Sequence, residues 1–159
     1  MIPLLLALLD EAYDRKSWHG TNLRGSLRGL TPAQAAWRPR RDRHNIWELA
    51  VHAAYWKYSV TRRLTGDPRG SFALDGSNWF ARPERGASTD EAWRRDLALL
   101  ADSHRALRAA VARLTPKDLE TIPPGSRTTV RALVTGVAAH DLYHAGQIQL
   151  LKRLQADAS

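Results

Sequence analysis

Two histidines, His140 and His144, lie four residues apart in the segment HDLYHAGQIQLLKR near the C-terminus. Four residues make about one helical turn, so in a helix both rings lie on one face, with Cβ atoms about 6 Å apart. Imidazole nitrogens bind zinc and nickel well, so the pair can supply two ligands of a metal site. The same spacing also arises by chance, and two core histidines bonded to backbone or carboxylate groups would produce it equally well.

Four other histidines have to be weighed as a third ligand. His52 and His104 each fall on an apolar helical stripe and are expected to point inward, and His19 lies close to another such stripe. Three inward imidazoles with one open position are the usual arrangement of catalytic zinc. Periodicity does not decide which of these rings meet. His44 precedes the expected start of a helix and is interpreted as a surface residue or a hydrogen-bond partner of a ligand.

The elements that must position these rings are helices. Apolar residues recur with helical spacing over residues 3–29, 45–66, 88–114 and 129–155, and a short turn is expected after Thr31. Asn45 followed by Glu48 has the pattern of a capping box, and Gly66 that of a helix end. Residues 67–87 are rich in Gly, Pro, Ser and Arg and form a long connection between the second and third helices. These features predict an all-α protein, a four-helix bundle forming a single domain over residues 1–159.

Composition removes several classes of protein. The chain has no cysteine, which excludes disulfides, cysteine-ligated zinc and a cysteine nucleophile. The net charge of +8 comes from 20 arginines and four lysines spread along the chain, without a nucleic-acid-binding motif, so no nucleic-acid partner is predicted. The apolar run at the N-terminus has no preceding basic residue and is interrupted by Asp10 and Glu11, so it is not expected to be a signal peptide. No apolar stretch approaches the length of a membrane span, so we expect no membrane partner and a cytoplasmic location.

Three segments together resemble the DinB-like family of metal-dependent enzymes. Residues 29–58, GLTPAQAAWRPRRDRHNIWELAVHAAYWKY, resemble that family's turn, its W-R-P motif and its second helix. The NWF of residues 78–80 resembles the aromatic-bearing crossover that follows. The segment HDLYHAGQIQLLKR resembles the last helix, with a histidine pair followed by Gly-Gln. The three segments occur in the expected order and span most of the chain.

The resemblance implies both an architecture and a site. It implies a four-helix bundle in up-down-down-up order, often a homodimer, and a divalent metal held by His52, His140 and His144. Zinc or nickel is expected first, with manganese or iron as alternatives. The family includes transferases that use low-molecular-weight thiols, and hydrolases, so a small-molecule substrate is expected. The catalytic group itself is unknown, being either metal-bound water or a thiolate. The alternative is a non-catalytic metal-binding or structural dimeric helix bundle.

Four residues are candidates for orienting a ligand or touching substrate: Asp141, Gln147, Tyr55 and Trp79. Asp141 can orient a ligand or form a helix-interface hydrogen bond, and Gln147 lies near the face of His144. Tyr55, like Tyr143, can donate to an oxyanion or serve only in packing. Trp79 is expected in a pocket wall or a dimer contact.

Arginine side chains are the expected partners of an acidic cosubstrate. The long connection carries Arg82 and Arg85, which can bind carboxylates with two parallel hydrogen bonds. A solvated, arginine-rich surface explains the same residues. Trp56, on the stripe of the second helix, is expected in the core.

Overall fold

The computed structural model describes residues 1–158, and the side chain of Arg85 lies outside what it describes. Over these residues the protein is helical and contains no strand, so the all-α prediction is confirmed. The α-helices and short 3-10 helices are, in chain order, α1 (Ile2–Tyr13), α2 (Leu23–Leu27), α3 (Pro32–Ala36), α4 (Ile46–Thr65), η1 (Arg85–Ala87), α5 (Asp90–Ala112), η2 (Asp118–Glu120) and α6 (Val130–Asp157).

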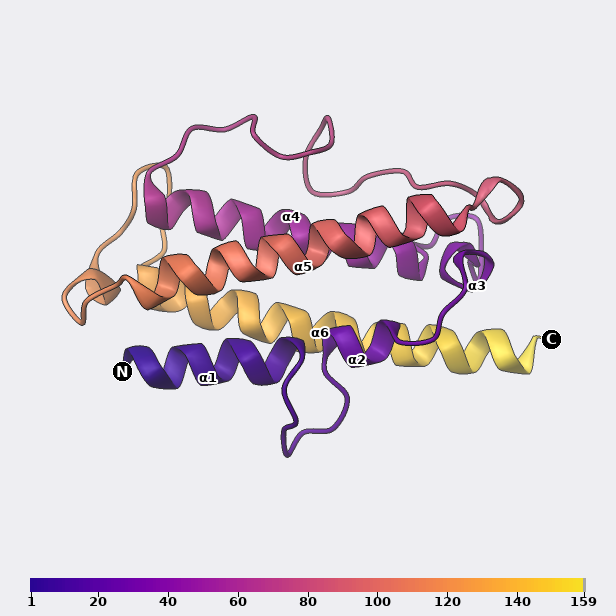
Figure 1. Ribbon diagram of the computed structural model, residues 1–159, viewed down its shortest axis with the longest axis horizontal. Helices are drawn as coiled ribbons and strands as arrows, with labels where there is room; N and C mark the ends of the chain where they lie inside the picture. The colour runs from indigo at the N-terminus through magenta and orange to yellow at the C-terminus, as the bar shows by residue number, and fades with distance from the viewer. Residues whose placement is uncertain (159) are drawn as a thin grey trace.

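The four long helices lie side by side along the longest axis of the molecule (Figure 1). Helices α1 and α6 run in one direction, and α4 and α5 run in the other. Helix α4 packs against both α5 and α6, and α1 packs against α5 and α6. The predicted long connection joins α4 to α5 and crosses the length of the molecule, which lets two consecutive helices run parallel. Within residues 1–158, no helix combines the length and hydropathy that a bilayer crossing requires.

Helix α4 begins and ends where the sequence predicts. The Asn45 side chain accepts a hydrogen bond from the backbone N–H of Glu48 at 2.8 Å, and the Glu48 carboxylate accepts one from the backbone N–H of Asn45. These two bonds satisfy N–H groups that have no partner within the helix. At the other end Gly66 adopts φ 79°, a left-handed conformation that glycine reaches without steric cost.

The predicted first helix over residues 3–29 is wrong, because the structure breaks it into α1 and α2 around a loop. Gly20 in that loop has φ +99°, which no continuing helix allows. Asn22 then starts a new helix by accepting a hydrogen bond from the backbone N–H of Gly25 at 2.8 Å. The apolar spacing persists on both sides of the loop, which is why periodicity alone suggests one helix.

A polar layer divides the interior into two apolar clusters. One cluster gathers around α2, α3 and the first half of α4, and the other around α1, the end of α5 and the first half of α6. Between them Lys57 of α4, His104 of α5 and Asp141 of α6 are all buried. Lys57 and Asp141 form an ion pair with both side chains fully buried. The same level of the bundle carries the histidines of the candidate site.

Candidate metal centre

Two helices bring three imidazoles together. His52 projects from the first half of α4, and His140 and His144 project from α6 one turn apart. Nε2 of His140 lies 3.1 Å from Nε2 of His52 and 3.0 Å from Nε2 of His144. One ligand nitrogen from each ring lies within 4.8 Å of the others, and this group could hold a metal ion.

The far nitrogens of two rings fix which nitrogen faces the centre. His52 Nδ1 lies 2.7 Å from the backbone carbonyl oxygen of Asn78, which only accepts, so Nδ1 carries the hydrogen. His144 Nδ1 donates in the same way to Oε1 of Gln147 at 2.7 Å. In a neutral imidazole the other nitrogen then has a free lone pair, so both Nε2 atoms face the centre as acceptors.

The arrangement suits a cation. A hydrogen on Nε2 of His140 can be donated to only one of its two neighbours, so at least one of the two close nitrogen contacts has no hydrogen bond. Nδ1 of His140 is buried without a hydrogen-bond partner in the described part of the chain. With the hydrogen of His140 on Nδ1, the three Nε2 lone pairs face one another within 4.8 Å and repel, and a divalent ion that accepts all three removes that repulsion. The donor set therefore fits zinc, nickel and similar borderline metals.

Burial keeps the three rings neutral. It lowers the pKa of His52 to about 4 and that of His140 to about 3, and it lowers the pKa of His144 as well. The neighbouring imidazoles add to the effect at His140, because a second positive charge beside the first is unfavourable. At neutral pH the nitrogens are thus free to bind a metal without first losing a proton.

Trp79 from the long connection covers one side of the centre. Its ring stacks on His52 at a centroid distance of 3.8 Å and on His44 at 3.6 Å, with both pairs nearly parallel. His44 is in turn held by the carboxylate of Glu48 at 2.9 Å. Trp79 therefore fixes the plane of the His52 ring, while Asn78 fixes its rotation.

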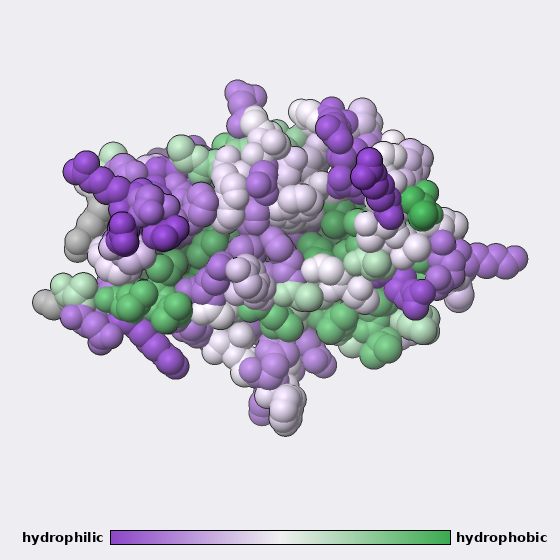
Figure 2. All heavy atoms as spheres, turned by 180° about the vertical axis from the view of Figure 1, so that it is seen from behind, coloured by the Kyte–Doolittle hydropathy of each residue, from purple (hydrophilic) through white to green (hydrophobic). Residues whose placement is uncertain are grey.

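Cavities flank the centre on two sides. One, of about 340 Å³, includes His140 in its wall and runs between α4, α6 and residues 125–128. The other, of about 480 Å³, includes His144 and follows the C-terminal half of α6. The wall of the second cavity is largely apolar, and its Leu150 and Leu154 side chains are exposed. Figure 2 shows hydrophobic side chains gathered at the end of the molecule that carries this part of α6, on the left in that view.

Residues 16–148, most of the chain, match the family model described as DinB superfamily. The chain belongs to the DinB superfamily. Searches of curated proteins and of solved structures found no match. All three segments that resemble the family contribute to the centre of this DinB-superfamily chain. Residues 29–58 supply His52, the last helix supplies His140 and His144, and the crossover supplies Trp79.

The remaining predicted residues divide into those near the centre and those away from it. Gln147 and Trp79 contact the imidazoles directly. Asp141 instead faces Lys57 across the helix interface, and its Oδ1 is buried without a partner in the described residues. Tyr55 packs in an aromatic cluster with Phe72 and Phe80.

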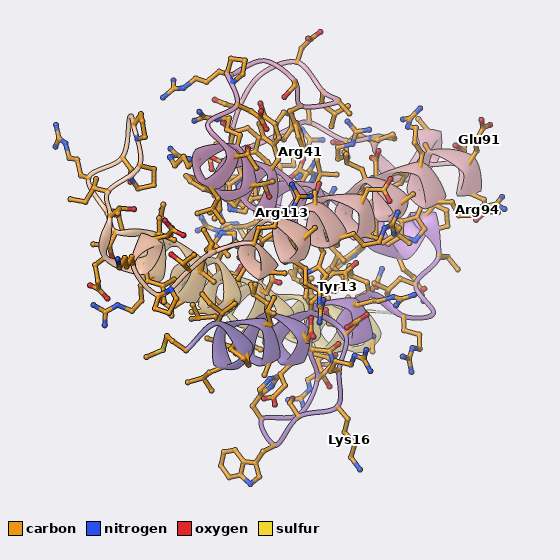
Figure 3. All side chains as sticks on the ribbon, turned by 60° about the vertical axis from the view of Figure 1, so that its left-hand side comes forward. Tyr13, Lys16, Arg41, Glu91, Arg94 and Arg113 are labelled. Atoms are coloured by element: carbon orange, nitrogen blue, oxygen red, sulfur yellow. The ribbon has the colours of Figure 1, made fainter. Side chains whose placement is uncertain are left out.

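Two histidines that spacing left open lie elsewhere. His104 is buried against Tyr13, with ring centroids 3.9 Å apart, and its Nδ1 lies 3.4 Å from Lys57 Nζ. Figure 3 labels Tyr13 where the end of α1 meets the interior. His19 is exposed in the loop after α1, beside Ser17. His104 therefore belongs to the polar layer of the core and not to the converging group.

Trp56 has a second role that the sequence did not suggest. It was expected in the core, but its ring is only half-buried and forms part of the cavity beside His140. Its Nε1 donates to the side chain of Asn78 at 3.0 Å. Asn78 thus holds both His52 and Trp56, and its φ of 66° is the only left-handed value at a non-glycine residue in the described chain. The NWF motif marked this segment without indicating that role.

The arginines expected to bind an acidic cosubstrate are not near the centre, as far as they are described. Arg82 is largely buried and pairs with Asp96 at 2.8 Å. The same carboxylate accepts a hydrogen bond from Trp47 Nε1 at 2.7 Å. Arg82 therefore tethers the long connection to α5. The side chain of Arg85 lies outside the described residues.

Proposed function

We propose that the protein is a divalent-metal-dependent enzyme that uses His52, His140 and His144 as its metal ligands, with thiol transfer ahead of hydrolysis. The convergence of three Nε2 atoms, two of them fixed as acceptors by partners at Nδ1, carries this proposal. Zinc or nickel fits neutral imidazole best, with manganese or iron as alternatives. A divalent ion with an open position lowers the pKa of bound water or binds a thiolate, and so activates either nucleophile.

The two flanking cavities favour transfer between two molecules over hydrolysis. Each cavity includes one of the α6 histidines in its wall, so a thiol and its electrophilic partner can approach from different sides. Hydrolysis requires room for only one organic substrate. Trp79 and the apolar parts of both walls limit access of bulk water, which protects a reactive nucleophile.

The same proposal covers the architecture and assembly. The four long helices, with α1 and α6 opposed to α4 and α5, support a four-helix bundle in up-down-down-up order forming one domain over residues 1–159. A homodimer is proposed along α6, supported by the exposed apolar side chains of Tyr143, Leu150 and Leu154, so that the partner would form the outer wall of the cavity beside His144 without filling it. Small molecules are the proposed substrates, and the cytoplasm the proposed location.

The alternative is a non-catalytic bundle whose histidines bind a metal for structure or serve in packing. Structural zinc sites are usually closed by four protein ligands, whereas the described residues bring together three. That difference supports the catalytic proposal.

Metal content is the first test. Protein purified without a histidine tag should contain about one divalent ion per chain, or gain thermal stability when one is added. His52→Ala and His144→Ala should each abolish metal binding, and His104→Ala, which lies outside the group, should retain it. Protein that neither contains nor responds to zinc, nickel, manganese or iron would refute the proposal, and full metal content in His52→Ala would refute the ligand set.

Thiol transfer is tested on the metal-loaded protein. We expect it to accelerate conjugation of a model electrophile to bacillithiol, mycothiol or glutathione, and to lose that activity with a chelator or in His140→Ala. If none of the three thiols reacts while an ester or amide substrate is hydrolysed in a metal-dependent way, hydrolysis replaces transfer. Absence of both activities in the metal-loaded protein would support the non-catalytic alternative.

A further inference from the structure

We propose that the cavity beside His140 binds a small organic acid, with its carboxylate held by Arg63 and Arg127 and its apolar body directed toward the histidine centre. This inference deepens the proposed function, because it names the class of one substrate of that site. Its contacts with the two arginines do not require the metal, so it can be tested separately.

The cavity is a channel with a different character at each end. Trp56 and His140 lie at one end, with ring centroids 6.2 Å apart. From there the wall follows α4 forward to Arg63 and α6 backward to Leu133. Seven residues separate Trp56 from Arg63 and also His140 from Leu133, which is about 10 Å of helix in each case. A ligand that reaches from the arginines to the centre is therefore on the order of 10 Å long.

The far end of the channel is positive. Two arginines form part of its wall, Arg63 from α4 and Arg127 from the segment before α6, and no carboxylate does. The segment that carries Arg127 lies at the same end of the molecule as the end of α4 (Figure 1). Within residues 1–158, neither guanidinium forms an ion pair, whereas other arginines, such as Arg38, Arg82 and Arg108, pair with acidic side chains.

Hydrogen bonds within α4 fix the guanidinium of Arg63. Its Nη1 donates to the carbonyl oxygen of Ser59 at 2.8 Å and to the hydroxyl of the same residue. These bonds fix the position of a partly buried guanidinium. Burial lowers its pKa, and nearby Arg62 and Arg69 add to the effect, but an arginine remains charged at neutral pH. A carboxylate that accepts hydrogen bonds from the remaining N–H groups of Arg63, on Nη2 and Nε, and from Arg127 would neutralise the local positive charge.

The middle of the channel is apolar and open. Its wall there consists of Val60 and Val137, together with the backbone of Gly136. A Cβ added at Gly136 would meet no atom within 4 Å, so the helix surface faces empty space at that point. An aliphatic or aromatic body fits this stretch, and the volume of about 340 Å³ matches a small ligand.

The inference is tested with 4-phenylbutyrate and its neutral amide. Calorimetry measures the binding of each compound to the protein with and without metal. We expect the acid to bind at least tenfold more tightly than the amide in both forms, because only the acid pairs with the arginines. Arg63→Gln and Arg127→Gln should each weaken binding of the acid about tenfold and leave the amide unchanged. Arg94→Gln is the matched control, since Arg94 points away from the molecule at the start of α5 (Figure 3).

Gly136→Leu provides a steric test that does not depend on charge. The added side chain enters open space, and leucine favours a helix more than glycine does, so the variant should fold with undiminished stability. It should bind neither probe measurably.

Equal affinity for acid and amide, wild-type binding by Arg63→Gln, or undiminished binding by Gly136→Leu would each overturn the inference, as would no binding by the wild type. Metal-free protein that binds the acid, but takes up no metal, would refute the proposed function and leave this inference standing.

Discussion

His52 and Asn78 lie 26 residues apart in the chain and are joined by a 2.7 Å hydrogen bond from the imidazole Nδ1 to the backbone carbonyl oxygen. The bond links the first half of α4 to the long connection and assigns the tautomer of the ring. The side chain of Asn78 accepts from Trp56 at the same time. One residue of an irregular segment thus positions both a proposed ligand and a cavity wall.

Substitutions at Asn78 should separate backbone from side-chain effects. Asn78 has φ 66°, which glycine tolerates and a β-branched residue does not. Asn78→Gly should bind metal within a few-fold of the wild type, because the carbonyl stays in place. Asn78→Val should shift the carbonyl and weaken metal binding about 10- to 100-fold, the usual effect of losing the partner of a ligand. Competition with a zinc chelator measures both, and equal affinities would contradict the argument.

Gln147 should act on the metal through His144. Gln147→Leu removes the acceptor at 2.7 Å from Nδ1, so we expect metal affinity to fall about 10- to 100-fold. Gln147→Glu keeps an acceptor and adds negative charge, which makes the imidazole a stronger ligand, so its affinity should equal or exceed that of the wild type. The same chelator competition compares the two, and an affinity of Gln147→Leu equal to that of the wild type would show that the bond does not matter for binding.

Substitutions at the buried ion pair of Lys57 and Asp141 should have non-additive effects on the free energy of unfolding. Burial raises the pKa of Asp141 to about 6, and Lys57 opposes that shift. Lys57→Met leaves the acid buried without its partner and should reduce the free energy of unfolding by about 3–5 kcal/mol. The double variant Lys57→Met/Asp141→Leu should recover most of that loss in urea unfolding.

The exposed pair of Arg131 and Glu120 serves as the control for this experiment. Arg131→Met should cost no more than about 1 kcal/mol, because water screens an exposed pair. A double variant at the buried pair that is no more stable than Lys57→Met would contradict the explanation based on the unpaired charge.

The metal-free protein should lose stability in acid through its buried histidines. Burial lowers the pKa of His52 to about 4 and those of His104 and His140 to about 3, against an ordinary value of 6.5. Between these values the unfolded chain binds protons that the folded chain does not, so stability rises with pH. The contribution is fully present above about pH 6.5 and is lost as the pH falls toward 3.

Urea unfolding at several pH values measures this dependence. Each buried histidine contributes up to about 1.4 kcal/mol per pH unit within its window. His104→Phe should therefore flatten the slope between pH 6 and about 4. An unchanged slope in His104→Phe would mean that His104 does not titrate as its burial implies.

The sequence alone determined the local features of this protein. The capping pair at Asn45 and Glu48, the helix end at Gly66 and the apolar stripes of α4, α5 and α6 follow from hydrogen bonding and periodicity over a few residues. The same local rules failed after Tyr13, because a stripe that resumes beyond a loop has the same spacing as an unbroken one.

Spacing alone left open which side chains meet; the resemblance to the DinB-like family implied His52, and the tertiary structure brings it to His140 and His144. His52 and His104 both point inward from long helices. The rotation of each helix about its axis decides the partners of its histidine. His52 of α4 faces the histidines of α6, whereas His104 of α5 faces Tyr13 and Lys57. The irregular connection contributes Asn78 and Trp79 to the centre because its path is fixed by distant packing and by the ion pair of Arg82 with Asp96. The spacing of residues gives their positions around the axis of one helix. A site also requires that several helices are placed correctly relative to one another, and that placement depends on packing across the whole core.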